Sequence, residues 1–131
     1  MKRKAPDFRL DLAILPMRAN DYNRAHWAVR AKKLEEWCQF ICVSLRPEEL
    51  RWLREHPAKR RVVITFFHSK PYDTDNLYAC AKQSVDAMKD TKNGLGIIVD
   101  DSPAWLELEV RQEIVKHRHL QLTRIEIWRE P

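Results

Sequence analysis

The chain has 131 residues, of which 44% are hydrophobic and 33% charged, and its formal net charge is +5. This length fits a single domain over residues 1–131, and the composition is that of a globular protein rather than a disordered or fibrous one. The sequence has no apolar run of signal-peptide or membrane-span length, so we expect a soluble, cytoplasmic protein that does not cross a membrane.

The positive charge is concentrated in the first half of the sequence. Residues 1–70 carry sixteen Lys and Arg against eight Asp and Glu, whereas residues 71–131 carry eight against eleven. A basic segment suits the phosphate backbone of a nucleic acid, and an acidic segment suits a metal ion. Ordinary surface charge gives similar counts, so charge alone does not decide between these interpretations.

The first half of the sequence predicts a strand, a loop and a long helix. Residues 7–15 alternate apolar and polar side chains, which is typical of a strand, and Pro16 ends it. A polar loop is expected over 18–23. From 25 to 45 the apolar residues recur at spacings of three and four, which predicts a helix with one stripe: Trp27, Ala31, Leu34, Cys38, Ile41 and Leu45. Such a stripe suits a core-facing helix and a dimer seam equally well.

The second half alternates strands and helices. Pro47 opens a short helix, and the run from Val62 to Phe67 is so apolar that it predicts a strand buried on both faces. The full set of expected elements here is a helix at 48–55, a strand at 59–68, a helix at 75–90 and strands near 105–116 and 119–129. This order predicts an α/β (α+β) domain in which a small mixed sheet of about four strands packs with two main helices.

Two pairs of aspartates are the candidate chemistry. Asp73 and Asp75 straddle one residue, so in extended chain their carboxylates would point the same way. Asp100 and Asp101 follow a short apolar run. Two carboxylates about 4 Å apart repel by roughly 4 kcal/mol at an effective dielectric constant of 20, and a divalent cation turns that repulsion into attraction.

Oxygen ligands without Cys or His favour magnesium or manganese, which can activate water and stabilise charge at a phosphate. The same aspartates are also typical of turns and helix caps, and each pair by itself fits that structural interpretation.

The combined motifs resemble those of a known family, the RusA-type Holliday junction resolvases. The family pattern is Asp-x-Asp-Asn, a helix with a lysine and then Asp-Ala, and a closing Asp-Asp. In this sequence it corresponds to Asp73–Asn76, Lys82, Asp86-Ala87 and Asp100-Asp101. A polar segment containing Asn23, His26 and Trp27, followed by a basic helix, is similar to that of phage-encoded members.

The resemblance implies a homodimeric endodeoxyribonuclease that needs magnesium, with manganese as a substitute. It implies that the enzyme resolves four-way DNA junctions by paired symmetric nicks in recombination and repair, in the cytoplasm of a bacterial or phage-infected cell. Asp73, Asp75 and Asp101 would be essential metal ligands, with Asp100 as a further ligand and Lys82 as a catalytic residue. Many members place the lysine three residues after the asparagine, at Ala79 here, whereas Lys82 is six residues after Asn76.

The supporting or DNA-binding residues would be Asn76, Asp86, Asn23, Arg24, His26, Trp27, Arg30, Lys32 and Lys33. The basic members among them lie off the apolar stripe of the helix at 25–45. Most of the five tryptophans suit core packing, and Trp27, beside Arg24 and Arg30, is the best candidate for stacking on an unpaired base.

Two other functions fit the same sequence. One is a DNA-binding protein without catalytic activity, in which the acidic residues are only structural. The other is a nuclease for flaps or other branched DNA instead of four-way junctions.

Overall fold

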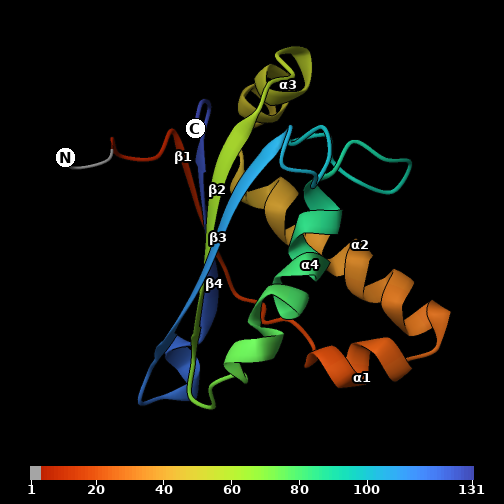
Figure 1. Ribbon diagram of the computed structural model, residues 1–131, viewed down its shortest axis with the longest axis vertical. Helices are drawn as coiled ribbons and strands as arrows, with labels where there is room; N and C mark the ends of the chain where they lie inside the picture. Colours follow the sequence, from red (N-terminus) through yellow and green to blue (C-terminus); the bar gives the residue numbers. More distant parts are fainter. Residues whose placement is uncertain (1–3) are drawn as a thin grey trace.

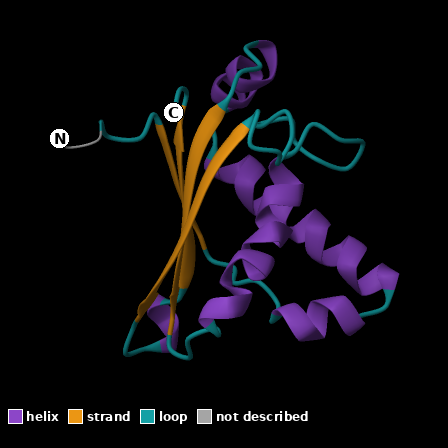
Figure 2. Cartoon of the chain, in the orientation of Figure 1, coloured by secondary structure: helices purple, strands orange, loops and turns teal. Residues whose placement is uncertain are grey.

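A four-stranded mixed sheet forms one layer, α2 and α4 pack against one of its faces, and α1 lies on the same side (Figures 1 and 2). The computed structural model describes residues 4–131. The elements are β1 (Phe8–Leu12), α1 (Ala19–Arg24), α2 (Trp27–Ser44), α3 (Pro47–Glu55), β2 (Arg60–His68), η1 (Thr74–Asn76), α4 (Leu77–Met88), β3 (Leu106–Ile114), η2 (Arg118–Leu120) and β4 (Leu122–Trp128). The expected α+β architecture with one small mixed sheet is confirmed.

The strand order is β1-β4-β2-β3, so strands from both halves of the sequence are interleaved. β2 pairs in parallel with β3 and antiparallel with β4, which itself pairs antiparallel with β1. Every residue from Arg60 to Phe66 is buried, as the apolar run at 62–67 predicts. Val62, Ile64 and Phe66 join the core under the helices.

α4 is the helix most deeply embedded in the fold. Eight of its twelve residues are buried, including Ala81, Val85 and Met88. The helix that the sequence predicts at 75–90 is therefore present but shorter. It begins at Leu77 because residues 74–76 form the 3-10 turn η1, and it ends before Lys89, whose backbone is extended.

The segment expected to be a polar loop at 18–23 is instead the short helix α1. Asn and Asp are weak helix formers, so local propensity predicts a loop. Ala19 is buried and faces a cavity shared with Asp73 and Cys80. Tertiary packing beside α4 thus outweighs the local preference.

The predicted apolar stripe of α2 is only half correct. Ile41 and Leu45 are buried, but Trp27 is 68% exposed and Ala31 is also exposed. Trp37, which is off that stripe, has no exposed surface. The stripe fails at its N-terminal end, where the first half of α2 extends past α4 to the corner with α1 (Figure 1).

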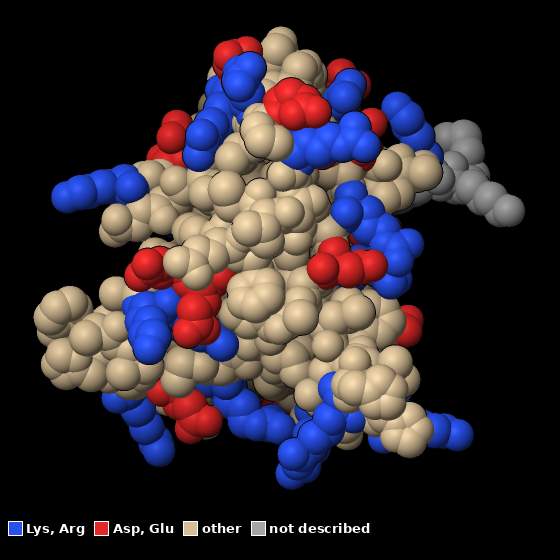
Figure 3. Space-filling view, turned by 180° about the vertical axis from the view of Figure 1, so that it is seen from behind, with Lys and Arg blue, Asp and Glu red and all other residues tan. Residues whose placement is uncertain are grey.

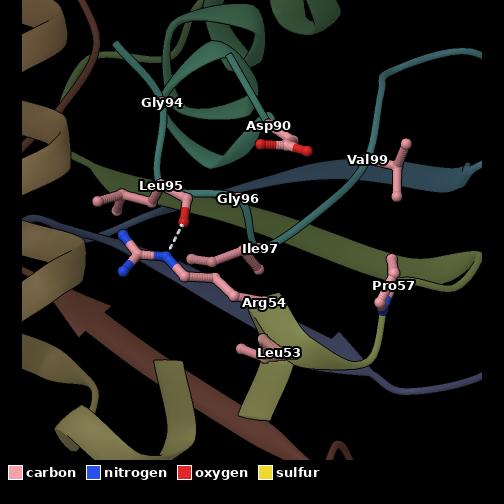
Figure 4. A pocket seen from close by; sticks show the side chains of 9 residues that line it. All are labelled: Leu53, Arg54, Pro57, Asp90, Gly94, Leu95, Gly96, Ile97 and Val99. Carbon is pink, nitrogen blue, oxygen red and sulfur yellow. Dashed lines mark hydrogen bonds between the residues drawn. The ribbon is translucent and has the colours of Figure 1, made fainter. Parts of the chain in front are cut away.

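A tight turn at 91–96 returns the chain from α4 towards Asp100 and Asp101. The backbone N–H groups of Leu95 and Ile97 donate to the carbonyl oxygens of Ala87 and Met88, both at 2.8 Å. Arg54 of α3 closes the turn from outside, because its Nε donates to the Leu95 carbonyl oxygen at 2.7 Å (Figure 4). None of the helices within residues 4–131 is long and apolar enough to cross a membrane.

The turn depends on the absence of a side chain at Gly94. A Cβ atom there would collide with the backbone carbonyl oxygen of Lys89, which cannot move away without displacing the end of α4. We expect Gly94→Ala to cost about 1–3 kcal/mol and to lower the melting temperature by roughly 3–10 °C. Thermal unfolding followed by circular dichroism measures this, with Asn93→Ala in the same turn as a control. A Gly94→Ala protein as stable as the control would show that the turn is not tightly held.

Candidate active site

Asp73 and Asp75, here called the Asp73 group, lie at the start of α4. Asp73 has an extended backbone (φ −60°, ψ 135°), and Asp75 lies in η1, which runs directly into α4. Both side chains are exposed. The chain from Asp73 to Asp75 is not continuously extended, contrary to the expectation from the sequence, because Asp75 lies in a 3-10 turn, which advances by about 120° per residue. A turn, not a strand, sets their orientation.

Gln112 of β3 fixes the loop that leads to Asp73. Its Oε1 accepts a hydrogen bond from the backbone N–H of Tyr72 at 3.0 Å, and its Nε2 donates to the Tyr72 carbonyl oxygen at 3.1 Å. The same Oε1 lies 3.0 Å from Nε2 of His68, whose ring stacks on Tyr72. Burial lowers the pKa of His68, which favours the neutral imidazole.

A second glutamine fixes the segment between β1 and α1. Gln83 of α4 is buried and forms two hydrogen bonds with the backbone of Met17, at 3.1 and 2.8 Å. The next residue, Arg18, places its guanidinium over the Tyr72 ring, 5.3 Å from the centroid. Arg18, Asp73 and Asn76 all line one cavity of about 170 Å³. This end of α4 therefore holds carboxylates, an amide and a cation together.

Asp86, Asp100 and Asp101, here called the Asp101 group, lie at the other end of α4 around Lys89. The ammonium nitrogen of Lys89 is 3.3 Å from Oδ1 of Asp86 and 3.4 Å from Oδ2 of Asp101. Burial alone would lower the pKa of Lys89, but the two carboxylates more than offset it and raise that pKa. The pKa of Asp100 is lowered, chiefly by a hydrogen bond from the backbone N–H of Asp101. Lys89 is thus the cation that this group binds within one chain.

The two acidic groups are separated by the length of α4. Its twelve residues span about 18 Å at 1.5 Å per residue. The far group cannot swing across, because the backbone N–H groups of Ile97 and Ile98 both bond to the Met88 carbonyl oxygen and both side chains are buried. Within residues 4–131, no cluster of three or more His, Cys, Asp or Glu is arranged to hold a metal ion. A single chain does not bring Asp73, Asp75 and Asp101 together around one cation.

A narrow stripe on the outer side of α4 connects the two groups. Tyr78, Ala79 and Lys82 are exposed, and Asp86 and Lys89 are partly exposed. Lys82 is seven residues before Lys89, so both lie on nearly the same helix face. Lys82 forms no ion pair with any residue that the structure describes. The predicted catalytic lysine is therefore accessible, but it contacts neither acidic group.

The predicted DNA-binding residues gather at the corner between α1 and α2. Asn23 and Arg24 are in α1, and His26 caps α2, its Nδ1 accepting from the backbone N–H of Ala28 at 3.1 Å. The remainder lie in the first half of α2, where Trp27, Arg30 and Lys32 are exposed and Lys33 is partly buried. Lys33 pairs with Glu36 at 3.9 Å, and the Trp27 ring lies 5.4 Å from that of His26.

The basic and acidic halves of the sequence do not form two separate surfaces. Interleaved strands pair them on the sheet face away from the helices, where Arg61 contacts Glu107 at 2.8 Å and Glu109 at 3.0 Å, and Arg124 contacts Asp11 at 2.8 Å. Seen from behind, acidic and basic side chains lie beside one another around the margin of the molecule (Figure 3). The charge asymmetry of the sequence is therefore a poor guide to where DNA would bind.

Sequence reasoning did not find Gln112, Gln83, Arg18 or Lys89 as site residues. A signal existed for Gln112, since it continues the period-two series Leu106, Leu108 and Val110 on the helix-facing side of β3. A polar side chain at such a position needs a hydrogen-bond partner. No comparable pattern distinguishes Lys89 from other surface lysines.

Comparison of the chain with protein-family models, with characterised proteins and with solved structures finds no match. The function must therefore be argued from the motifs and the geometry.

The paired hydrogen bonds of Gln112 give a direct test of how the loop before Asp73 is held. Gln112→Ala leaves the Tyr72 backbone without both partners, so we expect a loss of about 1–3 kcal/mol in unfolding free energy and faster amide exchange at Tyr72. Chemical denaturation and hydrogen exchange measure the two effects, with the exposed Gln39→Ala in α2 as control. Unchanged exchange at Tyr72 would contradict this role for Gln112.

Proposed function

We propose that this protein is a DNA endonuclease of the RusA type that acts as a homodimer. The observation that carries the proposal is the placement of the motif aspartates: Asp73 and Asp75 at one end of α4, and Asp101 at the other. The compound motif that contains them, from Asp73 to Asp101, is what resembles the family.

Two copies of the chain can bring together the Asp73 group and the Asp101 group, which a single copy keeps apart. A two-fold axis through the middle of the exposed α4 stripe would run the two helices antiparallel, so the Asp73 group of each copy would face the Asp101 group of the other. An isologous dimer of this kind contains two identical sites. Two sites related by a two-fold axis suit paired nicks in a symmetric junction.

The donor set of such a shared site is chemically consistent with magnesium. Carboxylates of Asp73 and Asp75 from one copy and Asp101 from the other provide only oxygen ligands, which hard divalent cations prefer. In the single chain, Lys89 compensates the Asp101 group, so a cation that bound there would compete with an ammonium group.

DNA as the substrate is supported by cations that have no carboxylate partner. Arg24, Arg30 and Lys32 at the α1–α2 corner form no ion pair within residues 4–131, unlike the arginines of the sheet face. Trp27 at the same corner offers an exposed aromatic face for stacking on a base.

Cleavage of a synthetic four-way junction tests the proposal. We expect symmetric nicks with magnesium and none with EDTA. Junction binding without cleavage would favour the non-catalytic DNA-binding protein. Faster cleavage of flaps than of four-way junctions would favour the nuclease for other branched DNA.

The aspartate carboxylates should be required for cleavage and not for binding. We expect Asp73→Asn, Asp75→Asn and Asp101→Asn each to lower nicking by at least about a thousandfold while junction affinity changes by only a few-fold, because each change removes a ligand charge and leaves the basic surface intact. The exposed Asp90→Asn serves as the control. Magnesium-dependent cleavage at the control rate by any of the three variants would remove that residue from the site.

Lys82 is the predicted catalytic lysine, and its position between the acidic groups allows a matched test. Its long side chain leans towards the Asp73 end of α4, as helical side chains do. We expect Lys82→Ala to lower cleavage by about a hundredfold or more, and Lys59→Ala, an exposed lysine before β2, to leave it unchanged. Lys89 is unsuitable as a control because it contacts Asp86 and Asp101. Equal activity of the Lys82 and Lys59 variants would exclude Lys82 from catalysis.

A further inference from the structure

A second cavity, of about 330 Å³, lies beside the Asp73 group at the end of β2. Three of its lining residues are basic, Arg18, Lys70 and Arg118, and none is acidic. We call it the basic cavity. Its volume is about ten times the roughly 30 Å³ that a water molecule takes up in the liquid, so a phosphate group fits inside it.

The three cations are not neutralised by the protein. Neither Arg18, Lys70 nor Arg118 forms an ion pair with a carboxylate in the part of the chain that the structure describes. Arginines on the sheet face away from the helices are paired instead. Arg61 and Arg111, for example, each contact Glu109, at 3.0 and 2.8 Å. Three like charges that converge on a concave surface repel one another and attract an anion.

The remaining walls of the basic cavity are preformed. Arg18 rests on the Tyr72 ring, and the Tyr72 hydroxyl donates to the Pro16 carbonyl oxygen at 2.9 Å. Gln121 fixes the chain where it leaves β2, because its Oε1 accepts hydrogen bonds from both the backbone N–H and the hydroxyl of Ser69, at 3.0 and 2.9 Å. Binding of a ligand would therefore cost little conformational entropy, because these side chains are already held in place.

The basic cavity adjoins the candidate active site directly. Arg18 and Tyr72 line both it and the smaller cavity that contains Asp73 and Asn76. Only the side chains of Arg18 and Tyr72, which line both cavities, would separate a phosphate bound here from the cavity that Asp73 lines.

We propose that the basic cavity binds a backbone phosphate of the DNA strand next to the phosphate that is cut. This inference rests on the proposed nuclease function. Arg18, Lys70 and Arg118 hold the anion, and the site fixes the register of the strand relative to Asp73. These contacts are made with the backbone and therefore carry no base preference.

The test compares Arg118→Ala and Lys70→Ala with Arg111→Ala, a control that removes the same charge from the sheet face away from the helices. Junction affinity is measured in EDTA at several salt concentrations. Each variant loses one phosphate contact in each subunit of the proposed dimer, so binding should weaken about 25- to 100-fold and the slope of log K against log salt should fall by about 1.8. The control should keep the wild-type slope. A second measurement follows the amide resonances of Ser69 and Gln121 during titration with inorganic phosphate.

We expect phosphate to shift those resonances in the wild type and in Arg111→Ala, but not in Arg118→Ala or Lys70→Ala. Shifts with inorganic phosphate but equal junction slopes in all variants would assign the basic cavity to a free phosphate compound and overturn the DNA contact. Equal slopes without shifts would overturn the anion site altogether. Failure of the nuclease proposal is seen separately, as absence of magnesium-dependent cleavage by the wild-type protein.

Discussion

The rigidity of α4 is the constraint on which the rest of this structure depends. Eight of its twelve residues are buried, and the turn that follows is fastened back onto its last carbonyl groups. Asp73 and Asp101 therefore lie near opposite ends of a helix about 18 Å long. Each chain presents two incomplete acidic groups, one at either end of an exposed polar stripe. The proposed site shared between two copies would reconcile this separation with the resemblance of the whole motif to one family.

The topology of the sheet decides which charged side chains are paired with one another. Because β1 and β2 from the basic half alternate with β4 and β3 from the acidic half, arginines pair with aspartate and glutamate across the sheet face that carries no helices. Arg24, Arg30 and Lys32 at the α1–α2 corner, and the three cations of the basic cavity beside Asp73, are among those without a carboxylate partner within residues 4–131. Both lie on the side where the motif aspartates are, so charge and candidate chemistry coincide there by fold and not by sequence order.

The sequence predicts the elements well where periodicity and breakers agree. Pro47 marks the start of α3, the apolar run at 62–67 gives the doubly buried β2, and Gly94 and Gly96 mark the turn. Predictions fail where tertiary packing overrides local preference, as in α1, or where the partner surface ends before the helix does, as at Trp27. The 3-10 turn that contains Asp75 also could not be predicted, because patterns of period two or 3.6 identify strands and α-helices but not a turn of three residues.

For the candidate site, sequence supplies the residue types but not the distances. The motif spacing identifies Asp73, Asp75 and Asp101 and predicts a helix between them, but it does not reveal that the turn at 91–96 leaves Asp101 at the far end of that helix. Likewise, Lys89 looks like any surface lysine until the fold places its ammonium group between Asp86 and Asp101. Contacts between segments far apart in sequence, such as Gln112 with Tyr72, depend on the sheet register and become visible only in three dimensions.

The most direct test of the shared site is complementation between two inactive variants. Purified Asp75→Asn and Asp101→Asn proteins are mixed, allowed to exchange subunits and assayed for magnesium-dependent nicking of a four-way junction. If each site takes Asp75 from one copy and Asp101 from the other, a mixed dimer carries one doubly damaged site and one intact site. Random exchange then restores about a quarter of the wild-type nicking rate, because half the dimers are mixed and each has one of two sites. If both aspartates of a site came from the same chain, every site in the mixture would be damaged, and a mixture as inactive as either variant alone would contradict this account.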